Sequence, residues 1–361
     1  MQKGNIANFS EQSSGVSKIY PSFSGKPVIV VGAGPVGIHV AQKLLKQKPE
    51  YPVMVFGNEP WKPYNRLRIS SVLSGDITIE TLDNSLHVPE NSQVIQHTNC
   101  AIKIIDRKAK TLTDANNITQ SYSKLILATG SSTYIPKIIG THLSGVYPYR
   151  NLNDIRNLQS RRNKSRHCLI IGGGLLGLEA ACAMQNELTN VVVVQSSNRL
   201  LSNLIDDEAS NIIKTHLENF GIKIVLGDGI QSLLGKQKLV GARLKSGKLL
   251  SCDTAILATG ISPNVSLARK AGLKINRGVV VDDMMKTSDD HIYAIGECAE
   301  HQGKVYGWLK PGYEQASVAA QTVFGLNSKY HGTVPAVRLK IADLPVYSLG
   351  QVNKSNVTKQ A

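Results

Sequence analysis

Apolar and polar positions follow the same order twice along the chain: an apolar run, a glycine-rich turn, a helix-like stretch and a second apolar run. The first copy starts with "VIVV" at 28–31 and reaches "VMVF" at 53–56. The second starts with "LII" at 169–171 and reaches "VVVV" at 191–194. Apolar runs without alternation are typical of strands buried on both faces of a parallel sheet. The pattern therefore predicts two α/β units.

Each unit is expected to place a helix directly after its glycine turn, ending near Gln47 in the first and near Glu187 in the second. Roughly 90 residues after each turn, a further apolar strand ends in Ala-Thr-Gly, as "LILATGSS" (125–132) and "AILATGIS" (255–262). A repeat of this length indicates a duplicated domain, because solenoid repeats have periods of about 20–50 residues.

The repeat also predicts where the units begin and end. The stretch at 287–320 has no counterpart after the first unit, so we expect it to be the first unit resuming. The predicted division is a disordered tail at 1–25, a first unit at 26–150, a second unit at 151–272, a continuation of the first unit at 273–330, and a truncated C-terminal segment at 331–361.

Composition excludes several classes of protein. A chain of 361 residues with 42% hydrophobic residues is globular and long enough for two or three domains. No apolar stretch approaches the roughly 20 residues of a membrane span, and the polar N-terminus lacks the apolar core of a signal peptide. We therefore expect a cytoplasmic protein. The five cysteines are scattered, which argues against a disulfide framework and against a metal site.

The net charge of +15 has three interpretations: a solvated basic surface, attraction to an acidic partner, or nucleic-acid binding. The densest basic cluster, at 161–166, precedes an apolar strand and contains no aromatic residue. We interpret it as an exposed connector, so no nucleic-acid partner is expected.

The two glycine turns point to dinucleotides. In a strand–turn–helix unit the first glycine permits the tight turn, the second lets the backbone approach a pyrophosphate, and the third allows close helix–strand packing. The helix N-terminus adds partial positive charge. Two such turns predict two dinucleotides, one a flavin held permanently and the other a nicotinamide that exchanges. The six glycines are Gly32, Gly34, Gly37, Gly172, Gly174 and Gly177.

Several segments carry a resemblance to a known family. They are "PYNRLRISSVLSG" (63–75), "VYPYRNLNDI" (146–155), "GGGLLGLEAA" (172–181), "IYAIGECAEHQGKVYG" (292–307) and "PAVRLKIADLPVYSLG" (335–350). With them the chain resembles the FAD- and NAD(P)H-dependent pyridine nucleotide oxidoreductases, particularly the flavin portion of the nitrite reductase large subunit. The last segment is more similar to rubredoxin reductases. The resemblance implies two Rossmann-like domains of the glutathione-reductase type, with a truncated third domain.

The resemblance implies a set of FAD contacts. Glu59 would accept the ribose hydroxyls, with Asn58 as the competing residue, and Arg66 would face the phosphates. Glu297 stands where the family has an aspartate that holds the ribityl chain. A helix starting near Pro311 would point its N-terminus at the flavin and stabilise the reduced ring. The complete implied set is Gly32, Gly34, Pro35, Gly37, Glu59, Asn65, Arg66, Ser70, Thr129, Gly130, Gly296, Glu297, Trp308 and Leu309.

A second set would contact NAD(P)H. Gln195 ends the second strand, where NADH-using relatives commonly have an acid that repels a 2′-phosphate. Because glutamine does not repel it, and Ser196, Ser197 and Arg199 lie near, we expect NADPH to be tolerated, with NADH not excluded. The implied set is Gly172, Gly174, Leu175, Leu176, Gly177, Glu179, Gln195, Arg199, Thr259 and Gly260.

Ser71 bears on the type of reaction. Relatives commonly have a lysine or a redox cysteine here, whereas this chain has Ile69-Ser70-Ser71. Serine forms no sulfenic acid or mixed disulfide, so thiol chemistry is not expected. No catalytic side chain is expected either, because the cofactors carry the hydride chemistry.

The resemblance and the charge together predict an electron-transfer flavoprotein. It would pass electrons from NAD(P)H through FAD to an iron-containing acceptor: a nitrite reductase component, or an acidic rubredoxin or ferredoxin. An oxidase using dioxygen and a flavin-bound sensor or scaffold are the alternatives. Relatives have a longer third domain, so either this domain is vestigial or the chain is a fragment of a longer protein; as a fragment, it could be followed by a sirohaem-carrying portion beyond residue 361. The oligomeric state stays open.

Overall fold

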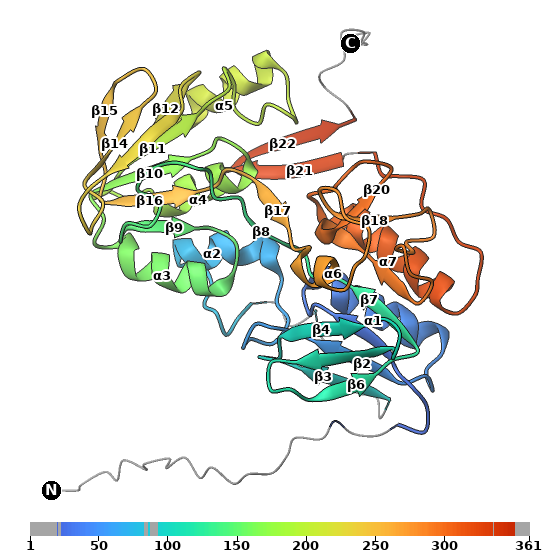
Figure 1. Ribbon diagram of the computed structural model, residues 1–361. Coiled ribbons are helices and arrows are strands. Elements are labelled where there is room, and N and C mark those ends of the chain that lie inside the picture. The colour runs from blue at the N-terminus through green and yellow to red at the C-terminus, as the bar shows by residue number, and fades with distance from the viewer. Residues whose placement is uncertain (1–19, 21–22, 83–85, 87–92, 335, 351–361) are drawn as a thin grey trace, which may run out of the picture.

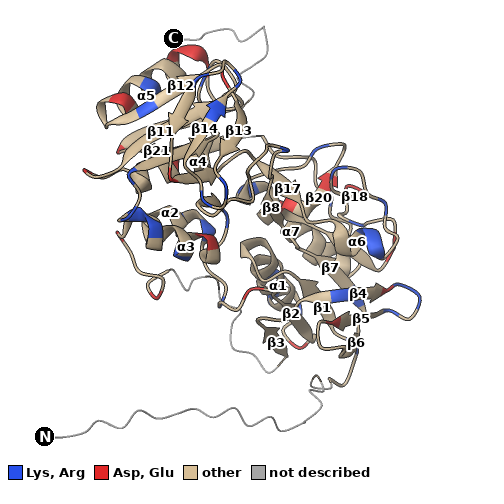
Figure 2. Cartoon of the chain, turned by 60° about the vertical axis from the view of Figure 1, so that its left-hand side comes forward, with Lys and Arg blue, Asp and Glu red and all other residues tan. Residues whose placement is uncertain are grey.

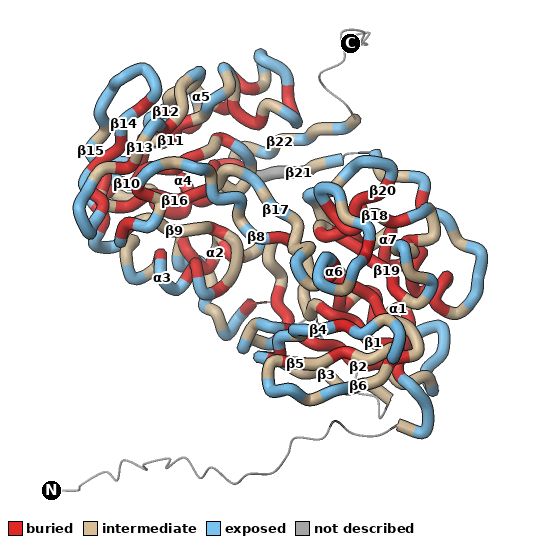
Figure 3. Tube along the Cα trace, in the orientation of Figure 1, coloured by how far each residue is buried: buried red, intermediate tan, exposed pale blue. Residues whose placement is uncertain are grey.

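The computed structural model describes residues 20, 23–82, 86, 93–334 and 336–350, which form two lobes (Figure 1). Each lobe is built on a five-stranded sheet. The first lobe has the strand order β19-β7-β1-β2-β3, and the second has β12-β11-β10-β16-β9. Figure 3 shows that buried residues are concentrated in these strands and in the helices packed on them.

The first sheet is parallel, as the continuous apolar runs predicted. Val28 in β1 pairs with Val53 in β2 on one side and with Lys124 in β7 on the other. The strands of this sheet are β1 (Val28–Val31), β2 (Val53–Phe56), β3 (Val94–His97), β7 (Lys124–Leu127) and β19 (Ile292–Ala294). All four residues of β1 are buried, because helices and a small meander cover the two faces.

The second sheet repeats this arrangement. Cys168 in β10 pairs with Val191 in β11 and with Thr254 in β16. Its strands are β9 (Val146–Pro148), β10 (His167–Ile171), β11 (Asn190–Gln195), β12 (Ile222–Leu226) and β16 (Thr254–Leu257). In both lobes the strand before the glycine turn lies between the second strand and the Ala-Thr-Gly strand, which is the duplication read from the sequence.

Three-stranded meanders and several helices complete the lobes. The meanders are β4 (Ile102–Asp106), β5 (Thr111–Asp114) and β6 (Thr119–Ser121), and β13 (Ile230–Leu234), β14 (Gly241–Leu244) and β15 (Leu249–Ser251). The helices are α1 (Pro35–Gln47), η1 (Arg66–Arg68), α2 (Ile69–Ser74), α3 (Leu152–Arg162), α4 (Leu175–Met184), α5 (Asp207–Asn219), α6 (Ser266–Lys270), η2 (Gly296–Cys298) and α7 (Leu309–Val323). Strands β18 (Val279–Val281) and β20 (Ala299–His301) form a parallel pair.

The chain returns to the first lobe after leaving the second. Ile292 of β19 pairs with Leu125 of β7, and α7 packs along α1. Between the lobes run two short strands, β8 (Ser131–Thr133) and β17 (Ile261–Pro263), which follow the two Ala-Thr-Gly segments and pair antiparallel. The two crossings between the lobes therefore support one another.

Helix α2 belongs by sequence to the predicted first unit, 26–150, but it packs in the second lobe. Ile69, Val72 and Leu73 are buried in one core with Leu158 of α3 and Leu178 of α4, which belong to the second lobe. Figure 1 shows α2 beside α3. A six-residue helix carries only one apolar face, and the sequence does not say which lobe covers that face.

Two helix limits differ from the expected ones. Helix α4 ends at Met184, before the expected Glu187, because the Asn186 side chain accepts a hydrogen bond from the Leu188 N–H (2.9 Å) and closes a turn. Helix α7 begins at Leu309, two residues before Pro311. A proline fits this first turn, where its missing N–H would have had no helical partner. Helix α1 ends at Gln47, as predicted.

The ends of the described chain also pack on the lobes. Tyr20, inside the predicted tail, donates a hydrogen bond to Asp114 (2.7 Å) and sets its ring edge against Phe56 (5.3 Å between centroids). Residues 1–19 and 21–22 of that tail lie outside the described residues. At the other end, β21 (Ala336–Ile341) and β22 (Leu344–Leu349) form a hairpin, and Ile341 is buried in the core of the second lobe.

Two further properties bear on the class of protein. Among the described residues, no helix combines the length and the apolar character needed to cross a membrane. All five cysteines lie in the described part of the chain and none of them is in a disulfide; four are buried and Cys182 is half-buried.

Candidate functional site

The first glycine turn has the geometry expected of a pyrophosphate cradle. Gly32 has φ +121°, and a Cβ on it would collide with the Ala128 carbonyl oxygen. A Cβ on Gly37 would collide with the Gly32 carbonyl. Gly34 differs, because the nearest atom to its Cβ position is the Arg66 Nε, 4.0 Å away. The outer glycines therefore close the turn, and the middle glycine faces open space.

The second turn repeats each of these features. Gly172 has φ +115° and faces the Ala258 carbonyl oxygen, and Gly177 faces the Gly172 carbonyl. No described atom lies within 4 Å of a Cβ built on Gly174. Both turns can thus accept a ligand against their middle glycine.

The helices after these turns offer free N–H groups. Gly34 and Gly174 are the N-cap residues of α1 and α4, and within the described chain no side chain caps either helix. Pro35 occupies the first position of α1, and Leu175 and Leu176 form the start of α4. Uncapped N–H groups and the helix dipole attract a phosphate. The two cradles therefore fit the pyrophosphates of two dinucleotides.

Beyond β2, an ion pair occupies the predicted ribose position. The Glu59 carboxylate pairs with the Arg66 guanidinium and accepts a hydrogen bond from the Tyr64 hydroxyl (2.7 Å). Burial raises the pKa of Tyr64, so this phenol stays a donor. The competing Asn58 is exposed. Tyr64 was not predicted from the sequence, because its role depends on contact with Glu59 and with the Leu152 N–H (3.2 Å).

A second ion pair surrounds the predicted ribityl contact. Glu297 in η2 pairs with Arg150 and accepts a hydrogen bond from the Ser131 hydroxyl (2.8 Å). Gly296 has φ +73°, and its N–H donates to the Gln315 side chain of α7 (2.7 Å). Arg150 was missed, because only the fold brings the residues before α3 to the η2 turn.

The two Ala-Thr-Gly segments form hydrogen bonds with residues next to the strands that connect the lobes. Thr129 donates to the Asn264 backbone oxygen (2.8 Å), and the Asn264 side chain donates back to the Thr129 oxygen (2.9 Å). Thr259 donates to the Tyr134 oxygen (2.5 Å). Gly130 and Gly260 both have positive φ, +63° and +107°. They stand directly before β8 and β17, where the chain turns into these two strands.

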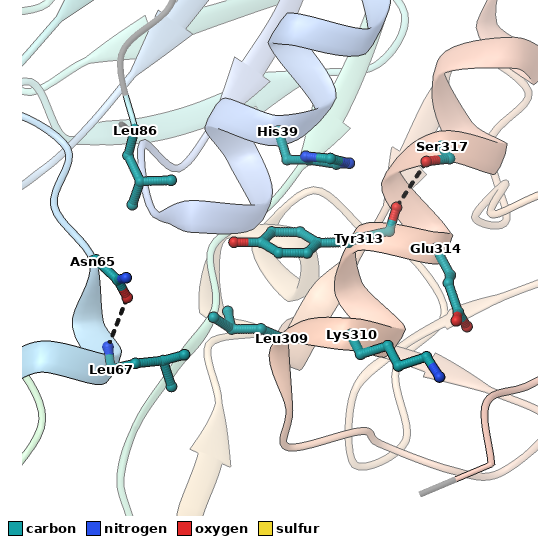
Figure 4. Close-up of a pocket in the computed structure, with 9 residues that line it drawn as sticks. All are labelled: His39, Asn65, Leu67, Leu86, Leu309, Lys310, Tyr313, Glu314 and Ser317. Carbon is teal, nitrogen blue, oxygen red and sulfur yellow. Dashed lines mark hydrogen bonds between the residues drawn. The ribbon is translucent and has the colours of Figure 1, made fainter. Parts of the chain in front are cut away.

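The N-terminus of α7 opens onto a hollow of about 490 Å³ (Figure 4), within the roughly 300–1,000 Å³ typical of ligand pockets. Trp308 is the extended N-cap residue of α7, and no described side chain caps that helix. The rings of His39 and Tyr313 lie against each other, 4.4 Å between centroids. The lining residues are His39, Asn65, Leu67, Leu86, Leu309, Lys310, Tyr313, Glu314 and Ser317. Asn65 and Leu309 are predicted FAD contacts.

Gln195 turns toward the second glycine turn. Its side-chain oxygen accepts from the Gly173 N–H (2.7 Å), and its amide donates to the Ser197 hydroxyl (2.6 Å). Arg199 is 3.1 Å from the Asp207 carboxylate and donates to the Ser202 oxygen (3.0 Å). Gln195 therefore lies against the second glycine turn, while Asp207 partly neutralises Arg199.

Lysines and arginines are distributed over both lobes (Figure 2). In the basic cluster at 161–166, Arg161 pairs with Asp253 (3.3 Å) and Arg162 donates to the Ala183 oxygen (2.9 Å). These two arginines therefore serve internal contacts of the second lobe, whereas Lys164 and Arg166 are exposed.

Comparison with known proteins identifies the family. Residues 26–322 match the family described as pyridine nucleotide-disulphide oxidoreductase. The chain belongs to this family. The predicted resemblance is therefore confirmed, and so is the α/β fold class with Rossmann-like domains. The family's cofactors are FAD and NAD(P)H, which fits the two glycine cradles.

Two relatives illustrate the range within the family. The NAD(P)H nitrite reductase of Bacillus subtilis is 36% identical over 338 residues, covering 92% of this chain and 42% of the relative. The nitric oxide reductase FlRd-NAD(+) reductase of Aliivibrio fischeri is 30% identical over 330 residues, covering 91% and 86%. The chain spans less than half the length of the nitrite reductase relatives that it matches.

Solved structures of the family share the fold. The ferredoxin reductase for the CYP199A2 system from Rhodopseudomonas palustris superposes with a TM-score of 0.81 at 26% identity, over 88% of this chain and 81% of that one. Reduced CoADR-RHD from Bacillus anthracis gives 0.82 at 25% identity, over 92% and 63%.

Proposed function

We propose that this flavoprotein passes electrons from NAD(P)H through FAD to an iron-containing protein acceptor. The observation that carries the proposal is the pair of cradles, Gly32–Gly37 and Gly172–Gly177, each closed by its outer glycines and open at its middle one. Because the crossings β8 and β17 pair with each other, the two cradles are held in a defined relation. A fixed relation between donor and acceptor sites is what direct hydride transfer requires.

Specific residues are proposed to hold each cofactor. The FAD-binding domain would comprise 26–150 and 273–330, except for α2 and β9, which pack in the second lobe, and the NAD(P)H-binding domain would comprise 151–272. In the first, Glu59 and Arg66 would bind the ribose and phosphates, and Glu297 the ribityl chain. When bound, FAD accepts a hydride and releases electrons singly. The uncapped N-terminus of α7 would stabilise negative charge on the reduced ring.

The acceptor is proposed to be a small acidic redox protein or a nitrite reductase component. The names of the relatives include a nitrite reductase, an assimilatory nitrate reductase electron transfer subunit and a FlRd-NAD(+) reductase. The net charge of +15 would accelerate encounter with an acidic protein. An oxidase reaction is less consistent with this chain, because Ser71 stands where the family resemblance implies a redox cysteine in oxidases.

The hollow at α7 is proposed as the docking site of this acceptor. Leu67, which is 63% exposed, and the exposed Lys310 both line the hollow. Lys43 is close enough to His39 to lower the pKa of that imidazole, after the larger effect of burial. The Glu314 carboxylate is engaged by the Thr333 hydroxyl. An apolar centre with basic neighbours suits an acidic electron carrier.

Reversing the charge of Lys310 should weaken the acceptor's encounter. We expect Lys310→Glu to raise the KM for an acidic rubredoxin about fivefold or more at low salt, with the difference shrinking as salt screens the charges. Lys236→Glu, on an exposed loop of the second lobe, makes the same charge change away from the hollow. Equal KM values for the two variants would contradict this docking site.

The coenzyme preference is proposed to depend on Gln195. In Gln195→Glu, the carboxylate can still accept the Gly173 N–H but repels a 2′-phosphate. We expect the ratio of kcat/KM for NADH to that for NADPH to rise about tenfold, equivalent to roughly 1.4 kcal/mol. Gln195→Met, similar in length and uncharged, is the control. An unchanged ratio in the glutamate variant would exclude Gln195 as the determinant.

The proposed function is tested in two steps. NAD(P)H should bleach the flavin absorbance of the purified protein in a stopped-flow experiment, which a sensor or scaffold would not require. Turnover with cytochrome c through added rubredoxin should then exceed oxygen uptake. Rapid bleaching with oxygen as the preferred acceptor would instead establish an oxidase.

A further inference from the structure

One tyrosine hydroxyl joins the two lobes beside the proposed FAD site. The Tyr64 hydroxyl donates a hydrogen bond to a Glu59 carboxylate oxygen (2.7 Å) and accepts one from the Leu152 N–H (3.2 Å). A phenol can make both bonds at once, because its oxygen carries one proton and two lone pairs. Tyr64 is only 7% exposed, so water has little access to either bond.

The two partners of Tyr64 belong to different lobes. Glu59 lies beyond β2, and its backbone oxygen accepts from the Asn99 N–H beyond β3 (2.8 Å), which attaches it to the first lobe. Leu152 is the first residue of α3 and is buried in the core of the second lobe. The Tyr64 ring is buried in that same core. Tyr64 therefore packs with the second lobe and reaches a carboxylate of the first.

The hydroxyl also completes the N-terminus of α3. The first four N–H groups of a helix have no partner within the helix. In α3 the Asn151 side chain accepts from the Asp154 N–H (3.0 Å), and the Tyr64 hydroxyl accepts from the Leu152 N–H. The place of this helix end consequently depends on a side chain that is bound to the first lobe.

Tyr64 contacts the first lobe away from the paired crossings β8 and β17. Arg150 acts at the crossing itself, because it donates to the Ser131 hydroxyl of β8 (3.0 Å) and pairs with Glu297. Tyr64 instead reaches the end of β2, which is separated from β7 by β1 in the first sheet. Two linked strands can serve as a hinge between lobes, and a contact away from the hinge restricts rotation about it.

We propose that Tyr64 is a positioning residue, which holds the α3 N-terminus against Glu59 and thereby sets the relation of the two cradles for hydride transfer. The inference rests on the proposed function, because this relation matters to a reaction only when FAD and NAD(P)H occupy the cradles. Glu59 is also the proposed ribose contact, so Tyr64 ties the second lobe to a residue that would hold FAD. Hydride transfer depends steeply on the placement of donor and acceptor, so a small rotation of the lobes slows it.

Tyr64→Phe keeps the ring and removes only the hydroxyl. We expect this variant to be purified with normal FAD content, because the Glu59–Arg66 ion pair and the first glycine cradle are unchanged. In stopped-flow experiments the limiting rate of flavin bleaching at saturating NAD(P)H should fall about tenfold, while the half-saturating NAD(P)H concentration should change by less than about twofold.

Tyr51→Phe is the matched control. It removes a hydroxyl that donates to the Ser123 hydroxyl (3.1 Å) within the first lobe, and it should equal the wild type in both constants. An unchanged limiting rate in Tyr64→Phe, a change confined to its half-saturating concentration, or loss of its FAD would each overturn the proposal.

A distance measurement follows the lobes without turnover. Spin labels on Lys108→Cys in the first lobe and Lys236→Cys in the second, both at exposed positions, report the separation of the lobes in the FAD-loaded protein. The half-buried Cys182 is replaced by serine in these samples. Pulsed electron resonance should give a broader or displaced distance distribution in Tyr64→Phe and the wild-type distribution in Tyr51→Phe. Identical distributions in Tyr64→Phe and the wild type would contradict a positioning role.

Hydrogen exchange in the unaltered FAD-loaded protein tests the contact if Tyr64→Phe does not fold. The Leu152 N–H should exchange slowly despite its place at the first position of α3, whereas the N–H of the exposed Asn153 should exchange fast. Fast exchange at Leu152 would overturn the proposal. If NAD(P)H does not bleach the wild-type flavin, the proposed function fails, while the distance and exchange measurements still decide on Tyr64.

Discussion

Replacing Gly34 by valine is expected to give a folded protein that is purified without FAD. The backbone at Gly34 is extended (φ −74°, ψ 178°), and its Cβ position meets only the Arg66 Nε at 4.0 Å, so the fold accepts a side chain there. The branched side chain would occupy the space in which a pyrophosphate approaches the α1 N-terminus. Losing two hydrogen bonds to a charged group, at about 1.5–3 kcal/mol each, weakens binding at least about 100-fold.

The duplicated cradle provides a matched control for this experiment. Gly174 has the same backbone conformation (φ −81°, ψ 179°), with no described atom within 4 Å of its Cβ position. Gly174→Val should therefore remain yellow, with normal FAD content, but NAD(P)H should no longer bleach it at ordinary concentrations. Flavin content and stopped-flow bleaching separate the two variants. If both variants lose FAD, or both keep it, the assignment of one cradle to each dinucleotide is wrong.

The outer glycines should respond in the opposite way, through stability rather than binding. A Cβ at Gly37 would overlap the Gly32 carbonyl oxygen, which belongs to the backbone and cannot rotate away. We expect Gly37→Ala to lower the free energy of unfolding by about 3 kcal/mol or more, at the upper end of overpacking costs. This is a large part of the roughly 5–15 kcal/mol by which domains are stable.

Urea denaturation measures the loss of stability in Gly37→Ala. Two further variants serve as comparisons, one expected to lose a similar amount and one expected to lose none. Gly177→Ala should cost a similar amount in the second lobe, because it faces the Gly172 carbonyl in the same way. Gly25→Ala has no atom within 4 Å of its new methyl group and should leave the midpoint unchanged. A stable Gly37→Ala protein that still binds FAD would show that the third glycine is not needed for close packing.

Sequence patterns predicted those parts of the site whose chemistry depends on neighbours along the chain. The three glycines of each turn act through local backbone geometry, so their spacing identified both cradles, and the structure gives each glycine its expected surroundings. Continuous apolar runs likewise predicted two parallel sheets.

Residues that act through distant partners could not be predicted in this way. Arg150 meets Glu297 across 147 positions, and Asn264 meets Thr129 across 135. Tyr64 is near Glu59 in sequence, yet its contact with the Leu152 N–H depends on how α3 packs. None of these residues belongs to a local sequence pattern, because their contacts form only when distant segments of the chain pack together.

The amino-acid sequence by itself determined the duplication, the parallel sheets and the two glycine cradles, because strand burial and glycine turns are encoded within about 20 residues of chain. Only the tertiary structure decided that α2 joins the core of the second lobe, that β8 pairs with β17, and that Arg150 pairs with Glu297. These features depend on apolar surfaces that are distant in sequence and become buried against each other on folding. A local sequence pattern does not specify which of these surfaces come into contact.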